Sequence, residues 1–536
     1  MERDPIQVGP AGYGAGRATA LALIAACALL ITACGGSGST ASAGHCKTIA
    51  GSASLTASAT ASGAWPYPNA DLANTRIAPA SAISSRNVSR LQPAWTFKLT
   101  GPAAAGVASS GSLAANPVVQ AGVVYLQDLD SNVYALSLSN GALQWEYRCN
   151  APEKSGPGPN GVAVLGGRVY GETPTAVFAL NASNGQPIWV NRHVLASGQG
   201  TFGIQPQVTD GRVYLGSQYG NGPGGGILIA LNAATGAPVW KFNTVVGPEP
   251  GVRALGLGSG GVWETPLVSP DGSVTYGIGN PYQTPAAAIA HPAVQLYTNS
   301  EVKLDAATGK LRWYYQAVPN DFKDYDMQAS PISARVGSTS VVVGGGKMGY
   351  VYEMNATTGK LLWKTAVGEH NGHDNDSLEA LEHHFTLKMP YTILPGSLGG
   401  VLTNMALAGG TVYLVTIDVP LTYANPNLPA ATKPTGSVGG EVEALSLKTG
   451  KVEWDTRVAS VPLGAATVSN DLVLTTLVNG TLLALDRQTG KLVYQHKLPT
   501  STNAPIAIAG NTVLVPAGGV ARGPSRDPQL VAYRLR

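Results

Sequence analysis

The stretch Ala230-Leu-Asn-Ala-Ala-Thr-Gly-Ala-Pro-Val-Trp240 decides the fold, because variants of it recur along the chain. Each copy places an apolar pair before a polar turn of the form Asn/Asp-x-x-Thr/Asn-Gly, and an aromatic residue closes the strand after the turn. The glycine suits a turn position with positive φ, and the Asn or Asp side chain can bond the backbone across the turn. The pattern therefore predicts a β-hairpin. The seven copies end at Trp145, Trp189, Trp240, Trp313, Trp363, Trp454 and Tyr494.

The repeating unit is larger than the hairpin. Most copies follow a further alternating strand, such as Gly211-Arg-Val-Tyr-Leu-Gly216, which makes an antiparallel meander. Trp95 occupies the same last-strand position without a hairpin of its own and is the eighth member of the series. Eight four-stranded sheets closed into a ring predict an all-β fold, an eight-bladed β-propeller spanning residues 64–536. We expect the strand around Trp95 to pair beside Leu530–Leu535, and the repeat tryptophans to dock between blades.

The composition agrees with a compact ring. The chain has 536 residues with 67 Gly and 37 Pro, is 44% hydrophobic and only 12% charged, which excludes wholesale disorder. Hairpin turns account for much of the glycine, and sheets buried on both faces account for the low charge. The formal net charge is +3 with no basic run, which argues against nucleic acid as a partner.

The repeat resembles the tryptophan-docking motif of pyrroloquinoline quinone (PQQ) propellers. The start of the domain, Trp65-Pro-Tyr-Pro-Asn-Ala-Asp-Leu-Ala-Asn-Thr-Arg76, resembles the corresponding segment of the quinoprotein alcohol dehydrogenases. This resemblance covers about residues 65–536 and implies oxidation of an alcohol or sugar on PQQ, assisted by Ca²⁺ or a lanthanide ion. Spacing points to where the site lies, because 73 residues separate Trp240 from Trp313 and 91 separate Trp363 from Trp454, against 40 to 51 elsewhere.

The first long gap carries matches to the cofactor and metal residues of the family. Gly260-Gly-Val-Trp263 resembles the segment whose tryptophan stacks under the quinone, for which a large flat ring is suited. The alternative for Trp263 is core packing. Gly277-Ile-Gly-Asn280-Pro281 resembles the segment whose asparagine carbonyl ligates the metal.

After the next hairpin, Tyr315-Gln-Ala-Val-Pro-Asn-Asp-Phe-Lys-Asp-Tyr-Asp326 resembles the family segment that carries the catalytic base. Asp324 matches this base and also a metal ligand, and Asp326 matches a further carboxylate of lanthanide-using members. A hard cation takes oxygen ligands and polarises the quinone carbonyl, while a carboxylate removes the alcohol proton. The alternative is that these acids cap turns on a solvated loop.

Two later segments resemble further cofactor contacts. Lys347, in Val342-Val-Val-Gly-Gly-Gly-Lys-Met-Gly-Tyr-Val-Tyr352, matches an Arg or Lys that contacts the quinone oxygens, although Lys lacks the two-pronged geometry of Arg. Asn404, in Gly399-Gly-Val-Leu-Thr-Asn-Met405, matches a channel-lining segment of the polyvinyl-alcohol-dehydrogenase-like branch.

The sequence departs from the family at several positions. Asn221 stands where a metal-binding Glu is found, so we expect it to be at most a weaker ligand, and Ala114 replaces a Glu near the cofactor. The vicinal Cys-Cys pair above the quinone is absent. These losses weaken the expected cation site, and Glu264 is a candidate substitute carboxylate.

In the second long gap, His370 and His373 lie beside acidic residues. Two histidines three residues apart can bind a transition metal, and the alternative is a polar, solvated rim.

The N-terminus reads as a processing signal. Residues 18–33 form a short apolar run, and Ile31-Thr-Ala-Cys34 resembles a lipobox, which would make Cys34 the lipidated first residue after a signal peptide of residues 1–33. An ordinary cleaved signal or an uncleaved anchor remains an alternative. Residues 34–63 are rich in Ser, Ala, Thr and Gly and predict a flexible tether. Cys46 and Cys149 are left to form a disulfide or to remain free thiols.

The leading hypothesis is an exported, membrane-anchored quinoprotein dehydrogenase that acts on a small alcohol or sugar. No Cys-x-x-Cys-His haem motif is present, so electrons must leave to a separate acceptor. One alternative is a non-catalytic propeller resembling the lipoprotein scaffold of outer-membrane protein assembly. Another is a propeller that binds a ligand without converting it.

Overall fold

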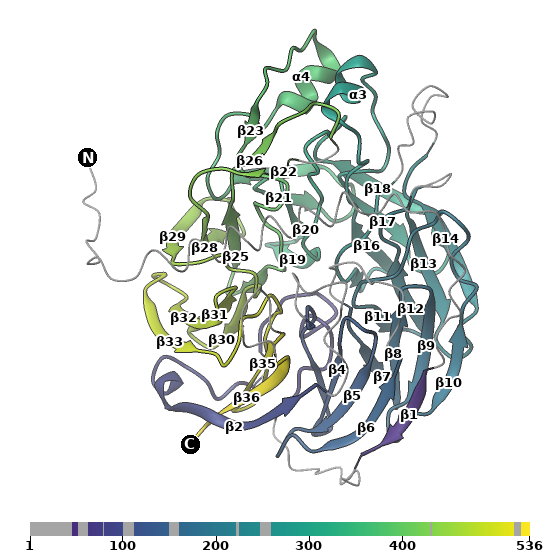
Figure 1. The fold of residues 1–536 in the computed structure, drawn as a ribbon, viewed down its shortest axis with the longest axis vertical. Coiled ribbons are helices and arrows are strands. Elements are labelled where there is room, and N and C mark those ends of the chain that lie inside the picture. The colour runs from purple at the N-terminus through teal and green to yellow at the C-terminus, as the bar shows by residue number, and fades with distance from the viewer. Residues whose placement is uncertain are drawn as a thin grey trace.

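The structure is a computed structural model that describes residues 46–51, 63–78, 80–99, 112–149, 160–220, 225–246, 259–428, 431, 433–518 and 527–536. The signal peptide predicted over residues 1–33, Cys34 and Asn221 lie outside these ranges. Four-stranded antiparallel sheets follow one another around a ring, as the hairpin repeat predicts (Figure 1). Among the described residues, no helix has the length and apolar character needed to cross a membrane.

The first four blades each use four consecutive strands. Blade 1 contains β3 (Val118–Gln120), β4 (Val123–Gln127), β5 (Val133–Ser137) and β6 (Leu143–Arg148). Blade 2 contains β7 (Ala163–Leu165), β8 (Arg168–Thr173), β9 (Ala176–Asn181) and β10 (Pro187–Asn191). Blade 3 contains β11 (Gln207–Thr209), β12 (Arg212–Gly216), β13 (Ile227–Asn232) and β14 (Pro238–Asn243). Blade 4 contains β15 (Leu267–Ser269), β16 (Ser273–Gly277), β17 (Ser300–Asp305) and β18 (Leu311–Gln316).

The last four blades include one interrupted by an insertion and one closed by the start of the domain. Blade 5 contains β19 (Ile332–Val336), β20 (Thr339–Gly346), β21 (Tyr350–Asn355) and β22 (Leu361–Ala366). Blade 6 contains β24 (Ala406–Ala408), β25 (Thr411–Asp418), β28 (Gly439–Ser446) and β29 (Val452–Val458). Blade 7 contains β30 (Thr467–Ser469), β31 (Leu472–Leu477), β32 (Thr481–Asp486) and β33 (Leu492–Lys497). Blade 8 contains β34 (Ala507–Ala509), β35 (Thr512–Ala517), β36 (Gln529–Leu535) and β2 (Leu91–Lys98), which follows the short 3₁₀ helix η1 (Val88–Arg90).

Blade 8 joins the two ends of the domain, which confirms the predicted closure. β2 pairs antiparallel with β36, with Trp95 opposite Ala532. A closed ring leaves no blade without a neighbour, so both faces of each sheet are covered.

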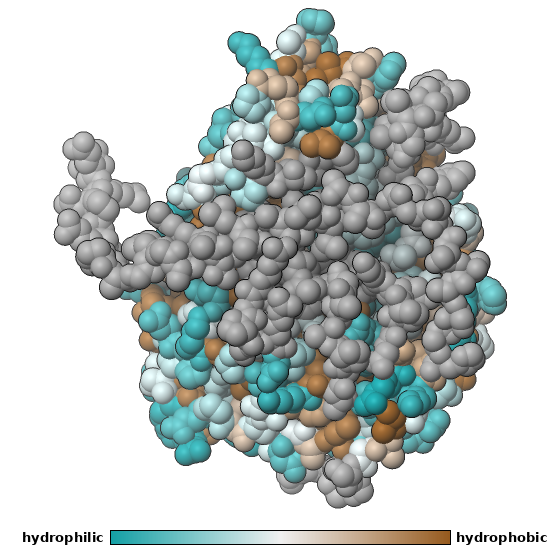
Figure 2. Space-filling model, in the orientation of Figure 1, coloured by the Kyte–Doolittle hydropathy of each residue, from teal (hydrophilic) through white to brown (hydrophobic). Residues whose placement is uncertain are grey.

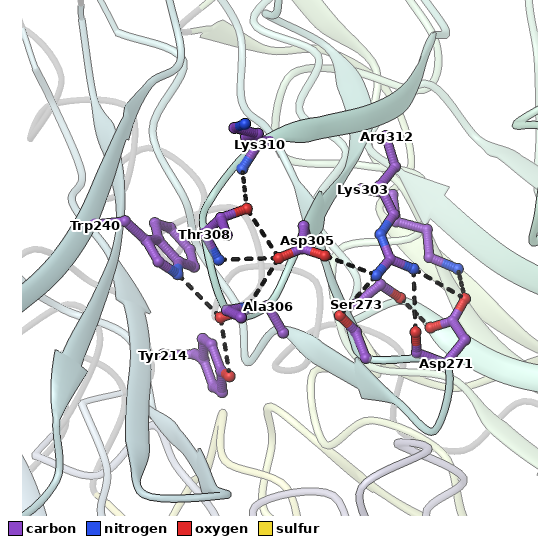
Figure 3. Close-up of polar contacts among 12 residues, drawn as sticks. Tyr214, Trp240, Asp271, Ser273, Lys303, Asp305, Ala306, Thr308, Lys310 and Arg312 are labelled. Atoms are coloured by element: carbon purple, nitrogen blue, oxygen red, sulfur yellow. Dashed lines mark hydrogen bonds and ion pairs between the residues drawn. The ribbon is translucent and has the colours of Figure 1, made fainter.

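The repeat tryptophans dock between blades, as expected. Each indole N–H of the series donates to a backbone carbonyl of the next blade's hairpin, and Trp240 donates to Ala306 at 3.0 Å (Figure 3). The repeat glycine is needed there, because Gly309 has φ of 70° and an added Cβ would lie 2.7 Å from the Trp240 ring. The remaining acceptors are the carbonyls of Leu138, Ala182, Ala233, Ala356, Leu447 and Arg487, for Trp95, Trp145, Trp189, Trp313, Trp363 and Trp454 respectively.

The predicted tether is partly structured. Residues Lys47–Ala50 form β1, which extends blade 1 by pairing antiparallel with β6. Cys46 and Cys149 form a disulfide at the end of this pairing, so of the two alternatives the disulfide is the one found. A four-residue strand on a sheet edge is too short to show periodicity, so the sequence pattern did not reveal it.

The N-terminal segment crosses the centre of the ring. Trp65 and Arg76 are fully buried. The Arg76 guanidinium binds residues of this segment and of blades 1, 7 and 8. Its acceptors are Asn69 Oδ1, Asn116 Oδ1, Ala466 O, Thr467 Oγ1 and Ile506 O.

Two insertions add structure beside blades 4 to 6. The first contains α3 (Pro285–Ala290), which begins at Thr284, whose side chain accepts from the Ala287 N–H. The second contains α4 (Asp376–Glu382) and a small sheet of β23 (Tyr391–Ile393), β26 (Leu421–Tyr423) and β27 (Lys433–Pro434). Residues 369–396 and 419–438 of this second insertion are called the cap below. α3 and α4 lie together at the top of Figure 1.

Apolar side chains concentrate between the blades. One buried cluster joins the N-terminal segment to blades 1, 7 and 8 and includes Trp65, Leu136, Leu474 and Leu514. On the face shown in Figure 2, the coloured surface carries scattered apolar patches among hydrophilic ones. The core therefore lies within and between the sheets.

Candidate active site

Three loops bring the predicted metal and catalytic residues together. Asn280 follows β16, Asp324 and Asp326 lie between β18 and β19, and Lys347 lies between β20 and β21. The Asn280 side-chain amide donates to Asp324 Oδ1 at 2.6 Å and to Asp326 Oδ1 at 2.8 Å. The Asn280 backbone N–H also donates to Asp326 Oδ1, at 2.7 Å. The loops of blades 4 and 5 thus form one carboxylate cluster.

Glycines in two of these loops allow the close approach. An added Cβ at Gly279 would lie 2.6 Å from Asp326 Oδ1 and 2.9 Å from Trp263 Nε1. An added Cβ at Gly346 would lie 2.2 Å from the Asp326 carbonyl oxygen. Both glycines belong to the motifs quoted from the sequence, so their role there is to admit the Asp326 backbone and carboxylate.

Asp324 is held in an unusual state. It is 2% exposed and has φ of 61°, a left-handed conformation that is uncommon for residues other than glycine. Burial raises the pKa of the Asp324 carboxyl well above its usual range, while the Lys347 charge opposes this shift. Backbone strain and a shifted carboxyl in one residue are features of functional sites.

Lys347 supplies the positive charge of the cluster. Its Nζ lies 2.5 Å from Asp326 Oδ2 and 3.6 Å from Asp324 Oδ2. The two carboxylates raise the pKa of the Lys347 ammonium although burial alone would lower it, so Lys347 remains charged. The same ammonium lies 6.0 Å from the Trp263 ring centroid. Lys347 therefore connects the acids to the predicted cofactor floor.

Trp263 lies beside the cluster with its polar atom free. Trp263 is 6% exposed, and its indole N–H has no acceptor among the described residues. Tyr219 meets the Trp263 ring edge to face at 4.9 Å, and Tyr282 stacks on Tyr219 at 6.1 Å. Trp263 is thus one of a group of three aromatic rings next to the acids.

Asn404 has hydrogen-bond partners different from those of the acids. Its Nδ2 donates to Glu264 Oε2 at 2.9 Å, and its Oδ1 accepts from the Ser330 N–H at 2.7 Å. Burial raises the pKa of Glu264 to about 8, opposed by the Asn404 hydrogen bond and the Arg76 charge. Asn404 and Glu264 therefore belong to the buried polar network around Arg76. Among the described hydrogen bonds, none joins either residue to Asp324.

The departures from the family have different outcomes. Ala114 is buried against Leu129, which leaves no carboxylate at this position. Asn221 lies outside the described residues, so its predicted role as a ligand stays a prediction.

The two histidines of the second insertion do not converge on one point. His370 Nδ1 pairs with Asp374 Oδ1 at 2.7 Å, and His370 Nε2 lies 3.1 Å from the Gly349 carbonyl. His373 Nδ1 pairs with Asp376 Oδ2 at 2.8 Å. Each histidine has its own acidic partner, which favours the polar rim over the metal site.

Sequence reasoning missed the groups that support the site. Asp321 Oδ1 accepts from the Lys323 N–H and Oδ2 from the Tyr325 N–H, so Asp321 organises the loop that carries Asp324. One sequence feature pointed to this support: Lys323 stands where the quinoprotein segment that resembles residues 315–326 has Trp.

The residues fit a hard cation and a planar quinone in their chemistry. Asp324 Oδ2 is a buried oxygen with no hydrogen bond among the described residues, and Lys347 Nζ lies 3.6 Å from it. Asp326 Oδ2 is also buried and is ion-paired with Lys347 at 2.5 Å. Oxygen donors of this type are those that Ca²⁺ prefers. Trp263 offers a flat ring and an unpaired N–H.

Family comparisons match most of the propeller. The model described as glucose/ethanol/alcohol dehydrogenase, beta-propeller domain, matches residues 65–164 and 205–370. The model described as outer membrane protein assembly factor BamB matches residues 406–535. The candidate carboxylates all lie in the first of these regions.

The curated relatives are dehydrogenases of low sequence identity. Quinohemoprotein alcohol dehydrogenase ADH-IIG of Pseudomonas putida is 29% identical over 331 residues, which are 56% of this chain and 45% of the relative. Putative dehydrogenase XoxF of Paracoccus denitrificans is 25% identical over 542 residues, and 85% of each chain is covered. The chain thus spans about half the length of the first of these relatives.

Solved structures share the fold. The quinohemoprotein alcohol dehydrogenase from Comamonas testosteroni superposes with a TM-score of 0.73 at 21% identity, covering 90% of this chain and 81% of that one. A europium-containing methanol dehydrogenase gives a TM-score of 0.70 at 20% identity, covering 88% and 98%.

Proposed function

On the premise that this propeller belongs to the PQQ-dependent quinoprotein alcohol dehydrogenase-like family, we propose that the chain oxidises an alcohol or sugar with PQQ and a Ca²⁺ or lanthanide ion. The observation that carries the proposal is the buried cluster of Asn280, Asp324, Asp326 and Lys347 beside Trp263. The four clustered side chains come from three loops, and each is of the type that the chemistry requires.

The proposed roles follow from the contacts. Asp324 accepts the proton of the substrate hydroxyl at Oδ2, the oxygen that no described group donates to. Asp324 and Asp326 offer carboxylate oxygens for the cation. Asn280, whose amide faces the two acids and whose Oδ1 accepts from the Tyr282 N–H, is proposed as a further ligand, and Asn221 as a weaker one. Lys347 keeps Asp324 more acidic than burial alone would allow. PQQ, when bound, would supply the carbonyl carbon that accepts hydride.

The cofactor contacts are proposed from the same geometry. Trp263 provides a flat surface beside Lys347, whose ammonium can reach polar atoms of a ring system lying on that surface. Asn404 is proposed to contribute to the cofactor site through Glu264, to which it donates a hydrogen bond and which directly follows Trp263 in the sequence. The electrons leave to a separate acceptor, because the chain has no haem attachment motif.

Reconstitution tests the proposal. Purified protein is mixed with PQQ and either CaCl₂ or LaCl₃, and we expect a bound-quinone absorption band and dye reduction with short alcohols or sugars in at least one metal. Absence of both signals in each metal would overturn the enzyme assignment. A quinone band without turnover of any alcohol or sugar would favour a propeller that only binds its ligand.

The chain is also proposed to be exported and anchored through lipid on Cys34, from the resemblance of Ile31–Cys34 to a lipobox. Cys34→Ala should move the protein from the membrane to the soluble fraction and abolish incorporation of labelled palmitate. Label retained by the variant would contradict this anchor.

Membership of the polyvinyl-alcohol-dehydrogenase-like branch is proposed from the segment around Asn404 alone. Turnover of polyvinyl alcohol oligomers at a rate similar to that of short alcohols is expected, and turnover restricted to short alcohols would contradict it. The non-catalytic scaffold remains the alternative, supported by the match of residues 406–535. That region contributes none of the clustered carboxylates.

A further inference from the structure

We propose that the cap is the element that positions Asp324, acting through Lys323 and Tyr325 on either side of it. This inference rests on the proposed role of Asp324 as the base. The residues flanking Asp324 direct their polar atoms into the cap, whereas Asp324 itself turns to Asn280 and Lys347.

Lys323 is the first anchor. Its side chain is fully buried, and its ammonium donates to the carbonyl oxygens of His373 at 2.5 Å and Asp374 at 3.2 Å. Both carbonyls belong to the cap segment that precedes α4. The ammonium also lies 4.9 Å from the Tyr325 ring centroid. A buried charge bound to two backbone carbonyls fixes the distance between the loop and this segment.

Two tyrosine hydroxyls form the second anchor. Tyr325 donates from its hydroxyl to the Pro395 carbonyl at 2.6 Å. In the opposite sense, Tyr423 of β26 donates to the Phe322 carbonyl at 2.8 Å. The loop is therefore held from both parts of the cap, residues 369–396 and 419–438.

The anchors explain how the loop keeps its backbone conformation. Asp321 binds the Lys323 and Tyr325 N–H groups at 3.0 and 2.8 Å, which curls the loop around its own side chain. Asp324 sits at the tip of this curl with φ of 61°. A left-handed non-glycine residue persists when surrounding contacts determine it. The cap supplies contacts to both residues that flank Asp324, and Asn299 adds hydrogen bonds to Asp321 Oδ2 and to the Tyr325 carbonyl.

Hydrogen exchange tests the anchoring without any cofactor. The amides of Lys323 and Tyr325 are hydrogen-bonded to Asp321, so their exchange rates report the integrity of the loop. Lys323→Met should raise these rates at least tenfold. The matched control is Lys360→Met, on an exposed hairpin, which should leave them unchanged. Unchanged rates in Lys323→Met would overturn the proposal.

Milder variants keep the test decisive if Lys323→Met does not fold. Tyr325→Phe and Tyr423→Phe each remove one hydroxyl, and each should raise the same exchange rates several-fold. Rates equal to those of the wild type in both variants would overturn the proposal. Lys323→Arg, which preserves a buried donor, should remain close to the wild type.

Kinetics separate a positioning role from a purely structural one. With PQQ and the active cation, Lys323→Met should lower kcat at least tenfold while KM changes less than twofold, and Lys323→Arg should restore most of kcat. Faster exchange with unchanged kcat would overturn the positioning of Asp324. If the wild type has no turnover, the proposed function fails, and the exchange rates alone still decide whether the cap holds the loop.

Discussion

Asp305 and Asp324 lie in neighbouring parts of the chain and are held in opposite ways. Asp305 ends β17 in the docking hairpin and accepts hydrogen bonds from Thr308 and from Arg312 at 2.9 Å (Figure 3). These donors, Arg312 first, lower the pKa of Asp305 to about 2. Asp324 is buried, and burial raises its pKa.

The difference separates the repeat from the site. The hairpin acid is satisfied by residues within seven positions of it, so each copy of the motif carries its own partners. The partners of the site acid, Asn280 and Lys347, lie 44 and 23 positions away, in the loops of blades 4 and 5. A carboxylate whose hydrogen bonds all come from nearby residues has a structural role. A buried carboxylate oxygen without a hydrogen bond can still accept a proton or bind a cation.

The largest effect is expected when the site carboxylate, Asp324, is replaced. Asp324→Asn removes the proposed base and should lower kcat by about 10² to 10⁴-fold, the usual contribution of a general base. Circular dichroism should remain that of the wild type. Asp305→Asn, the matched change, should leave kcat within twofold. Comparable turnover in the two variants would remove Asp324 from its role.

The second effect concerns Lys347, whose positive charge offsets the cost of burying Asp324 and Asp326. Lys347→Met leaves two buried carboxylates without their cation and should lower the free energy of unfolding by about 3 to 5 kcal/mol at pH 7. Without Lys347 the folded-state pKa of Asp324 rises further, so the loss should shrink as the pH falls and the carboxyls take up protons. Urea unfolding at pH 7 and pH 4 measures this.

The control for Lys347 is the exposed pair of the hairpin. Arg312→Met removes the partner of Asp305, which is partly exposed, and should cost less than about 1 kcal/mol. An equal loss in the two variants would show that burial does not distinguish the two aspartates.

The third effect tests the docking side. Gly309→Ala combines a left-handed backbone with a Cβ at 2.7 Å from the Trp240 ring, and should destabilise by about 1 to 3 kcal/mol. Gly337→Ala has φ of 59° but no atom within 4 Å of the added Cβ. The excess of the first loss over the second, measured by urea unfolding, is the contribution of docking. Equal losses would mean that only backbone strain matters.

The smallest effect concerns Asp305 itself. Because its folded-state pKa is lowered, its stabilisation is present above the usual carboxyl pKa and is lost as the pH falls through about 2. Asp305→Asn should therefore lower the free energy of unfolding by less than about 1 kcal/mol at pH 7, and the difference should close near pH 2. Thermal unfolding at both pH values measures this, and a difference that grows at low pH would contradict it.

The fold could be predicted from the sequence because the residues that form each hairpin turn lie within one short motif. The glycine, the Asn or Asp and the terminal Trp of each copy are close in sequence, and ring closure follows from the position of Trp95. β1 was not predicted, because a four-residue edge strand is too short to carry a sequence pattern of its own.

The site was predicted through resemblance, and the structure brings Asn280, Asp324, Asp326 and Lys347 together. Their roles stay predictions. What the sequence did not reveal was the support behind Asp324. The Lys323 ammonium finds its acceptors 50 residues later in the chain, in an insertion without repeats. Nothing local in the sequence encodes such a contact.

Arg76 has a consequence for the order in which the molecule can be assembled. This residue belongs to the first segment of the domain to be synthesised, yet one of its acceptors, the Ile506 carbonyl, follows 430 positions later. Its other carbonyl acceptor, Ala466, follows after 390. Until both are made, the guanidinium at the centre of the ring lacks the groups that compensate its burial. The contacts of Arg76 are therefore complete only once blades 7 and 8 have been made. A nascent chain that stops after blade 6 has a buried-type guanidinium without its two carbonyl acceptors.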